Sequence, residues 1–236
     1  MNAERFLDAS VQVEELLRQS EAGNTDGQLD LDSLITRSKA LTPEHKRKLH
    51  NWRRLRNVIV HSSRLNSKPI ADPRETEVIE LERLVGILRN PPRVSAVLDL
   101  VPPVVLRWDS EVSDFFSELM PPKEFSQAPF TDQDGNYRLI TSNAVARWAA
   151  SSYEVNSGVI LEKTQIAEVA GHSEEGDKLL CRRHDLTSQE AIDLLTTLKG
   201  IPPAAILLTD TGHERGKAMG LAVRADLPSL YRSLQL

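Results

Sequence analysis

The sequence predicts an α+β protein in which an N-terminal bundle of α-helices precedes two copies of a β-α-β-β-α unit. Two observations support this fold class. Apolar residues recur at helical spacing through the first part of the chain, whereas short apolar runs flanked by turn residues dominate the rest. Pro91 and Pro92 end the helical part, so we predict a helical domain over residues 1–92 and a repeated domain over residues 93–236.

Four helices joined by short connections are expected in the first domain, which is typical of a small bundle. Thr42 can cap the third helix, and Pro43 suits the first helical position because it needs no backbone N–H there. The helices are expected over residues 1–20, 29–39, 42–60 and 74–88, with a glycine-containing linker at residues 23–27.

The second domain contains the same order of elements twice. The first copy, over residues 93–152, has a strand at 105–108, a helix ending near Leu119, and strands at 128–132 and 139–141. The second copy, over residues 153–236, has a strand at 180–183, a helix ending near Leu195, and strands at 205–209 and 220–223. A unit of this kind cannot bury its apolar face alone, so we expect the copies to pack together with a ligand cleft between them.

Composition narrows the function classes. The 236 residues carry a formal net charge of −5, which disfavours nucleic-acid binding by the whole surface but not by a local basic face. A single cysteine, Cys181, excludes an internal disulfide and favours the cytoplasm, and no close pair of metal ligands is present. The apolar runs are too short or too interrupted for a signal peptide or a membrane span.

The repeated unit resembles the CBS-domain pair, or Bateman module, which binds adenine nucleotides and related ligands in many regulatory proteins. Family members end each repeat with a glycine, two apolar residues, a threonine or serine that meets phosphate, and an aspartate three places later that binds the ribose. The first copy keeps Thr141 but has Ala144 at the aspartate position, and the second keeps Asp226 but has Val223 at the hydroxyl position.

The resemblance therefore implies a regulatory adenine nucleotide or a relative of it as ligand, and no required cofactor. The residues that it assigns to the ligand site are Phe130, Thr141, Arg224 and Asp226. Neither motif is complete, so a degenerate pair used only for dimerisation is the alternative.

The end of the third helix holds a second pattern, in which Arg56 is followed by the polar residue Asn57 and, after three apolar positions, by His61. This pattern resembles the signature of HEPN domains, whose active members are metal-independent endoribonucleases. The resemblance implies that Arg56 binds the scissile phosphate, that Asn57 is its polar neighbour and that His61 acts as base or acid. Arg56 and His61 lie about 140° apart on an ideal helix, so a second subunit or an irregular helix end has to bring them together.

Two alternatives follow for this domain. In the first, a ligand-controlled ribonuclease binds RNA along the basic residues between Lys46 and Arg56 and works as a homodimer. In the second, Arg56 is structural and pairs with Glu77, Glu80 or Glu82 of the fourth helix, and the protein is a ligand sensor or a dimerising scaffold without enzymatic activity.

Overall fold

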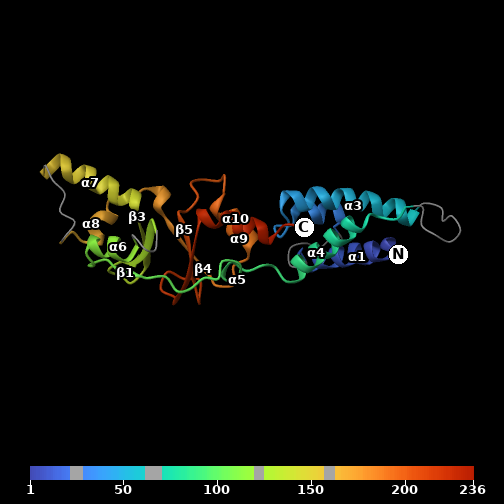
Figure 1. The fold of residues 1–236 in the computed structure, drawn as a ribbon, viewed down its shortest axis with the longest axis horizontal. Helices are drawn as coiled ribbons and strands as arrows, with labels where there is room; N and C mark the ends of the chain where they lie inside the picture. The colour runs from blue at the N-terminus through green and yellow to red at the C-terminus, as the bar shows by residue number, and fades with distance from the viewer. Residues whose placement is uncertain (22–28, 62–70, 120–124, 157–162) are drawn as a thin grey trace. The chain divides into compact units, whose positions relative to one another are not determined.

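The computed structural model describes residues 1–21, 29–61, 71–119, 125–156 and 163–236. These residues form two compact units (Figure 1). The first unit contains Met1–Pro92 together with Arg232–Leu236, and the second contains Arg93–Tyr231. Helices and strands are thus combined in one chain as expected, while the linker expected at residues 23–27 lies outside the described residues.

The first unit is built from α-helices. They are α1 (Asn2–Glu21), α2 (Leu31–Arg37), α3 (Pro43–His61) and α4 (Glu75–Arg89). Their bounds agree within two residues with the helices expected from the sequence. Asp30 starts α2 by accepting a 2.8 Å hydrogen bond from the Ser33 N–H, which satisfies one of the free donors at the helix end.

Helical spacing of apolar residues places the core of this unit. On α1, Phe6, Val13 and Leu17 are almost fully buried, and they face Val78 and Leu81 of α4 in the same core cluster. Because α2 adds Leu34 and Ile35 and α3 adds Leu49, Trp52 and Ile59 to this cluster, the helices α1 to α4 share one core. Val60, which the helical wheel assigns to the apolar side, is instead exposed.

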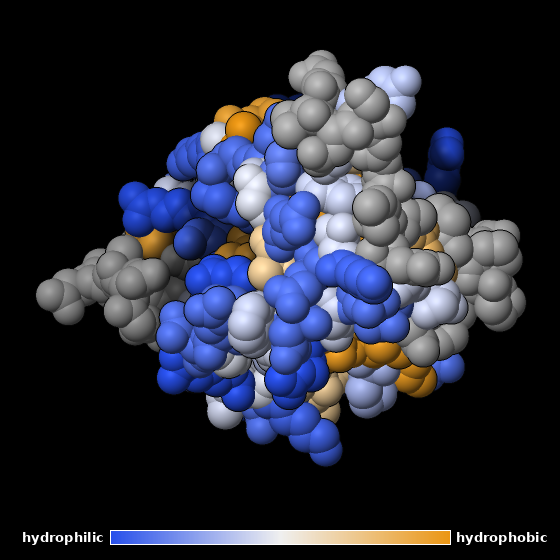
Figure 2. Space-filling view, turned by 90° about the vertical axis from the view of Figure 1, so that its left-hand side faces the viewer, coloured by the Kyte–Doolittle hydropathy of each residue, from blue (hydrophilic) through white to orange (hydrophobic). Residues whose placement is uncertain are grey.

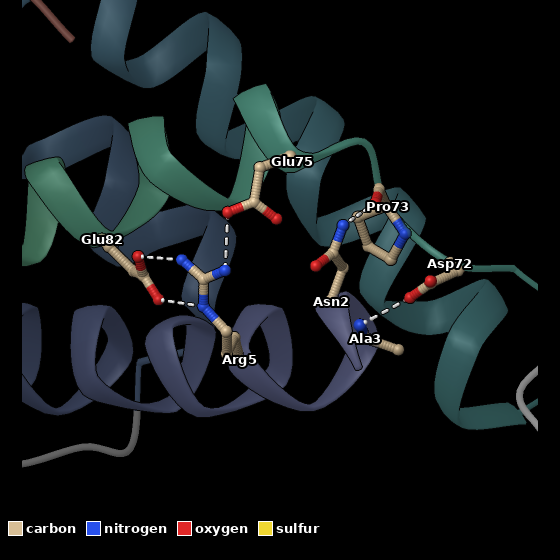
Figure 3. A network of polar contacts seen from close by, with 7 residues as sticks. All are labelled: Asn2, Ala3, Arg5, Asp72, Pro73, Glu75 and Glu82. Atoms are coloured by element: carbon tan, nitrogen blue, oxygen red, sulfur yellow. Dashed lines mark hydrogen bonds and ion pairs between the residues drawn. The ribbon is translucent and has the colours of Figure 1, made fainter.

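Polar contacts hold the start of α1 against α4 (Figure 3). Arg5 forms a bidentate pair with Glu82 at 2.9 and 2.7 Å and reaches Glu75 at 2.7 Å. The hydrogen bonds from Arg5 lower the pKa of the Glu82 carboxyl. The Ala3 N–H donates to Asp72 at 2.8 Å, so the segment before α4 also satisfies a free donor in the first turn of α1.

The last residues of the chain belong to the first unit. Leu234 is buried, and the partly buried Leu236 packs against the core cluster of α1 to α4. The Leu234 carbonyl lies 2.7 Å from Nε2 of His45, a buried residue of α3. Burial lowers the pKa of His45 despite this hydrogen bond, so the ring is neutral at neutral pH and Nε2 is the donor. The tail that follows the second unit therefore completes the bundle.

The second unit repeats one arrangement of elements. The first copy has α5 (Val94–Val97), β1 (Leu106–Arg107), α6 (Val112–Leu119), β2 (Gln127–Thr131), β3 (Tyr137–Thr141) and α7 (Ser142–Asn156). The second has α8 (Ile166–Ala170), η1 (Glu175–Asp177), β4 (Leu179–Arg183), α9 (Ser188–Leu195), β5 (Ala205–Thr209), β6 (Ala218–Val223), η2 (Arg224–Asp226) and α10 (Leu227–Ser233).

Both copies contain a three-stranded sheet of the same topology. The orders are β1-β2-β3 and β4-β5-β6, with the first pair of strands parallel and the second antiparallel. Thr141 pairs with the first residue of β2, and Val223 pairs with the first residue of β5. Thr141 and Val223 therefore occupy equivalent places, and the internal repeat expected from the sequence is present in the structure.

Each copy begins with a short helix whose first residue bonds to the other copy. The Val94 N–H at the start of α5 donates to the Leu186 carbonyl of the second copy at 3.0 Å. In the opposite direction, the Ile166 N–H at the start of α8 donates to the Ser110 carbonyl of the first copy at 2.9 Å. This exchange joins the copies through backbone hydrogen bonds as well as through side chains.

The end of the second unit that carries α7 and α8 has a largely hydrophilic surface (Figure 2). The apolar side chains of the first copy gather inside it instead. Phe115 of α6, Ile140 of β3 and Trp148 of α7 are fully or almost fully buried in one cluster. The sheet and its helices thus form a packed support for the residues described next.

Candidate functional site

A cavity of about 590 Å³ lies within the second unit. Segments of both copies enclose it: β2, the turn after it and β3 from the first copy, and α8, η1, the start of β4 and the loop before β6 from the second. The lining residues are Trp108, Phe130, Asp132, Gln133, Tyr137, Arg138, Leu139, Ala167, Ala170, Ser173, Glu174, Asp177, Lys178, Leu179 and Glu214. Its size suits a small organic ligand.

The buried carboxylate of Asp177 connects the lining to β3 and α7. Its Oδ1 accepts a 2.7 Å hydrogen bond from the Thr141 hydroxyl, and its Oδ2 accepts from the Glu174 N–H at 2.9 Å and from Arg147 of α7. Arg147 also donates to the His172 carbonyl at 2.8 Å. Asp177 is 7% exposed, so these donors replace the water that an ionised carboxylate would otherwise require.

A second carboxylate, Asp132, closes the turn between β2 and β3. It accepts from the Asn136 N–H at 2.8 Å and from Nε of Arg138 at 3.0 Å. Burial raises the pKa of Asp132, but the hydrogen bonds from Asn136 and Arg138 outweigh it, so the pKa lies below its ordinary value. Asp132 is therefore ionised at neutral pH and holds Arg138 at the cavity.

Three aromatic side chains, those of Trp108, Phe130 and Tyr137, complete the recognition chemistry of the lining. Phe130 is buried in the core of the first copy, and Trp108 packs against the same core. The cavity thus combines aromatic rings that can contact a planar base with carboxylates that can accept hydrogen bonds from hydroxyl or amino groups.

The four residues assigned to the ligand site do not meet in this cavity. Phe130 belongs to the lining, and Thr141 reaches it only through Asp177. Thr141 also accepts from the Ala144 N–H at 3.1 Å and so caps α7. Asp226 accepts from the Val223 N–H at 2.8 Å, and exposed Arg224 donates to the Pro202 carbonyl at 2.6 Å, so both serve local structure at η2.

The residues that sequence reasoning did not select are Asp177, Arg147 and Asp132. Asp132 had a readable signal, because an aspartate that begins an Asp-Gln-Asp-Gly segment between two strands is typical of a tight turn. Asp177 and Arg147 lie 30 residues apart and gave no local signal. Their pairing depends on the packing of α7 of the first copy against the segment that precedes β4.

In the first unit, Arg56 points toward α1 rather than toward the end of α3. Its guanidinium lies 3.8 Å from Glu14, which also binds Arg18 at 2.7 Å. The side chain of Arg56 is 32% exposed and is therefore not enclosed in an apolar environment. The expected alternative partners on α4 are engaged elsewhere, since Glu77 accepts from Trp52 and Glu80 from Lys48.

Asn57 and His61 are exposed on α3, which is helical through His61. The regular helix keeps Arg56 and His61 about 140° apart, so the structure does not bring them into one site within a single chain. The neighbouring basic residues are also partly neutralised. Arg53 pairs with Asp32, and Lys48 forms a short ion pair with Glu80.

Two classes of site are absent from the part of the chain that the structure describes. None of its helices is both long and apolar enough to cross a membrane. No three side chains of the His, Cys, Asp and Glu types gather there as a metal site. Cys181 is a buried free thiol whose pKa is raised to about 11 by burial, so it is protonated at neutral pH.

No protein-family model matches the chain, and no curated protein matches it in sequence. Solved structures similar to it are CBS-domain proteins. CBSX2 in complex with AMP is 15% identical with a TM-score of 0.40, covering 58% of this chain and 96% of that one. The CBS domain of a membrane protein from Sphaerobacter thermophilus is 18% identical (TM-score 0.44, 65% and 97% covered), and CbpB in complex with c-di-AMP is 10% identical (TM-score 0.42, 65% and 94% covered).

Proposed function

We propose that the second unit is a CBS-domain pair that binds an adenosine-type ligand in its cavity and thereby regulates the helical unit. One observation carries this proposal: the two copies share one topology and jointly enclose a cavity with aromatic rings and carboxylates. A purine base has two flat faces for aromatic contact, and ribose hydroxyls are donors for carboxylates.

The free hydrogen-bonding capacity of the lining favours two acceptors for the ribose. Asp132 and Asp177 already accept several hydrogen bonds from the protein, whereas the side chains of Glu174 and Glu214 are 69% and 52% exposed. Glu174 and Glu214 are therefore the proposed acceptors, with Tyr137 as the aromatic contact. Asp177 and Arg147 position the segment that carries Glu174.

A Tyr137→Ala variant is expected to weaken adenosine binding by roughly 5- to 150-fold, because aromatic stacking on a base contributes about 1–3 kcal/mol. Isothermal titration calorimetry on the full chain measures this. The matched control is Tyr153→Ala, which removes an exposed tyrosine of α7 that is not part of the lining. Equal affinity of the two variants would contradict the proposed base contact.

For the first unit we propose a HEPN-like bundle whose ribonuclease site is shared between two subunits. A second copy is necessary because Arg56 and His61 lie about 140° apart around the axis of α3. The competing proposal is a dimerising scaffold, and the ion pair of Arg56 with Glu14 within the bundle favours it. In both proposals the protein is a homodimer, which sedimentation at micromolar concentration measures.

If the first unit is a ribonuclease, the parent protein is expected to cleave RNA in the presence of a chelator. The His61→Ala variant is expected to lose this cleavage. Arg56→Ala should then also abolish cleavage while lowering the free energy of unfolding by less than about 1 kcal/mol, because both partners of its ion pair contact solvent. The scaffold proposal predicts no chelator-resistant cleavage by the parent protein. A monomer by sedimentation would rule out the shared site.

A further inference from the structure

We infer that the ligand of the cavity is a nucleoside with no net negative charge, and that phosphate groups on it weaken binding. This inference rests on the proposed function of the second unit. It concerns the chemical class of the ligand, and three features of the cavity support it. They are the excess of carboxylates in the lining, the ion pairs that its basic groups already form, and the position of the Asp177 carboxylate.

The lining contains more carboxylates than basic groups. The lining holds the carboxylates of Asp132, Glu174, Asp177 and Glu214 and the basic groups of Arg138 and Lys178. Arg147, which is not part of the lining, pairs with Asp177 and Glu174. A phosphate monoester adds a charge of about −1.5 to −2 at neutral pH, so it would lie close to the negatively charged carboxylates of the lining. Like charges brought together in a binding site disfavour the complex.

Both basic groups of the lining already have carboxylate partners. Nε of Arg138 lies 3.0 Å from Asp132, and its Nη1 lies 3.9 Å from Glu214. Lys178 forms a short ion pair with Glu175 of the same turn. A phosphate would have to displace a partner that belongs to the protein before it gained a cation.

Asp177 also occupies two donors that lie next to the lining, the Thr141 hydroxyl and the Arg147 guanidinium. The Thr141 hydroxyl donates to Asp177 at 2.7 Å, and Arg147 donates to the other oxygen of the same carboxylate. Arg147 also lies 3.4 Å from Glu174. Asp177 thus supplies, from within the chain, the anion that a nucleotide phosphate would otherwise bring. The remaining exposed carboxylates, Glu174 and Glu214, suit hydroxyl or ammonium groups.

A series of ligands that differ only in the 5′ substituent tests this inference on the full chain. The probes are adenosine, 5′-amino-5′-deoxyadenosine, AMP and ATP, titrated by calorimetry at low and high salt. Adenosine and the amine are expected to bind at least about tenfold more tightly than AMP, and ATP more weakly still. The difference should shrink at high salt, because salt screens charge repulsion at a partly open site.

A variant that lacks one charge of the lining distinguishes charge repulsion of the phosphate from a poor steric fit of the phosphate. Glu214→Gln should lower the ratio of the dissociation constants of AMP and the amine by about threefold or more. The substitution removes one charge of the lining and frees one side of Arg138. Asp185→Asn is the control, because it removes a partly exposed carboxylate outside the lining. If this ratio is unchanged in Glu214→Gln, the electrostatic explanation is wrong.

The outcomes distinguish the inference from the proposed function. If AMP or ATP binds more tightly than adenosine, the inference is wrong while the adenosine-sensing function stands. If none of the four probes binds at millimolar concentration, the proposed function is wrong and the inference with it. Tighter binding of the uncharged and cationic probes supports both.

Discussion

Arg147→Leu is expected to lower the free energy of unfolding of the second unit by about 3 kcal/mol. The substitution leaves the carboxylate of Asp177, 7% exposed, without its guanidinium partner, and breaking one side of a buried ion pair costs more than the pair contributes. Part of Arg147 contacts solvent, with 31% of its side chain exposed, which keeps the expected loss at the lower end of the range for buried pairs.

Hydrogen exchange during urea unfolding of the full chain measures this loss separately for each unit. The double variant Arg147→Leu with Asp177→Leu should recover much of the stability, because it removes both charges together. Arg107→Leu serves as the control, since Arg107 pairs with Asp109 at an exposed position, and we expect little change there. A small loss in Arg147→Leu without rescue in the double variant would contradict the buried pair.

Leu234→Ala is expected to destabilise the first unit by roughly 2–4 kcal/mol, although Leu234 follows the entire second unit in sequence. Leu234 is 4% exposed and its carbonyl binds His45, so the shorter side chain leaves a cavity beside α3. The buried Trp52 of α3 reports unfolding of this unit by fluorescence when Trp108 and Trp148 are replaced by phenylalanine.

The matched control is Leu198→Ala, which removes the same atoms from a side chain that is 99% exposed and should leave unfolding unchanged. If Leu234→Ala behaves like the control, the tail does not contribute to the core of the bundle. A second variant that ends the chain after Tyr231 should show a larger loss, because it also removes Leu236.

Elements with a strong periodic signal could be predicted from the sequence. The spacing of Phe6, Val13 and Leu17 determines the buried face of α1, and the apolar run at β5 determines a strand buried along its whole length. The repeat was readable because both copies place turn residues and strands in one order. These signals are local, so a single sequence contains them in full.

The candidate site was less predictable, because its contacts join residues that are distant in sequence. The resemblance to CBS domains assigns Thr141 to phosphate, but packing of the copies places Asp177 against its hydroxyl. The alternative in which Arg56 is structural pairs it with a glutamate of α4, but the arrangement of the helices gives it Glu14 of α1. Which carboxylate reaches a given donor depends on how helices and copies pack, and periodicity does not specify that.

The division of the first unit between two distant stretches of chain has a consequence for biosynthesis. When residues 1–92 leave the ribosome, Leu234 and Leu236 have not yet been synthesised, and the apolar groups that they cover are accessible to water. At a translation rate of about 5–20 residues per second, synthesis of the intervening residues takes on the order of ten seconds. During that interval the nascent bundle lacks the residues that complete its apolar packing.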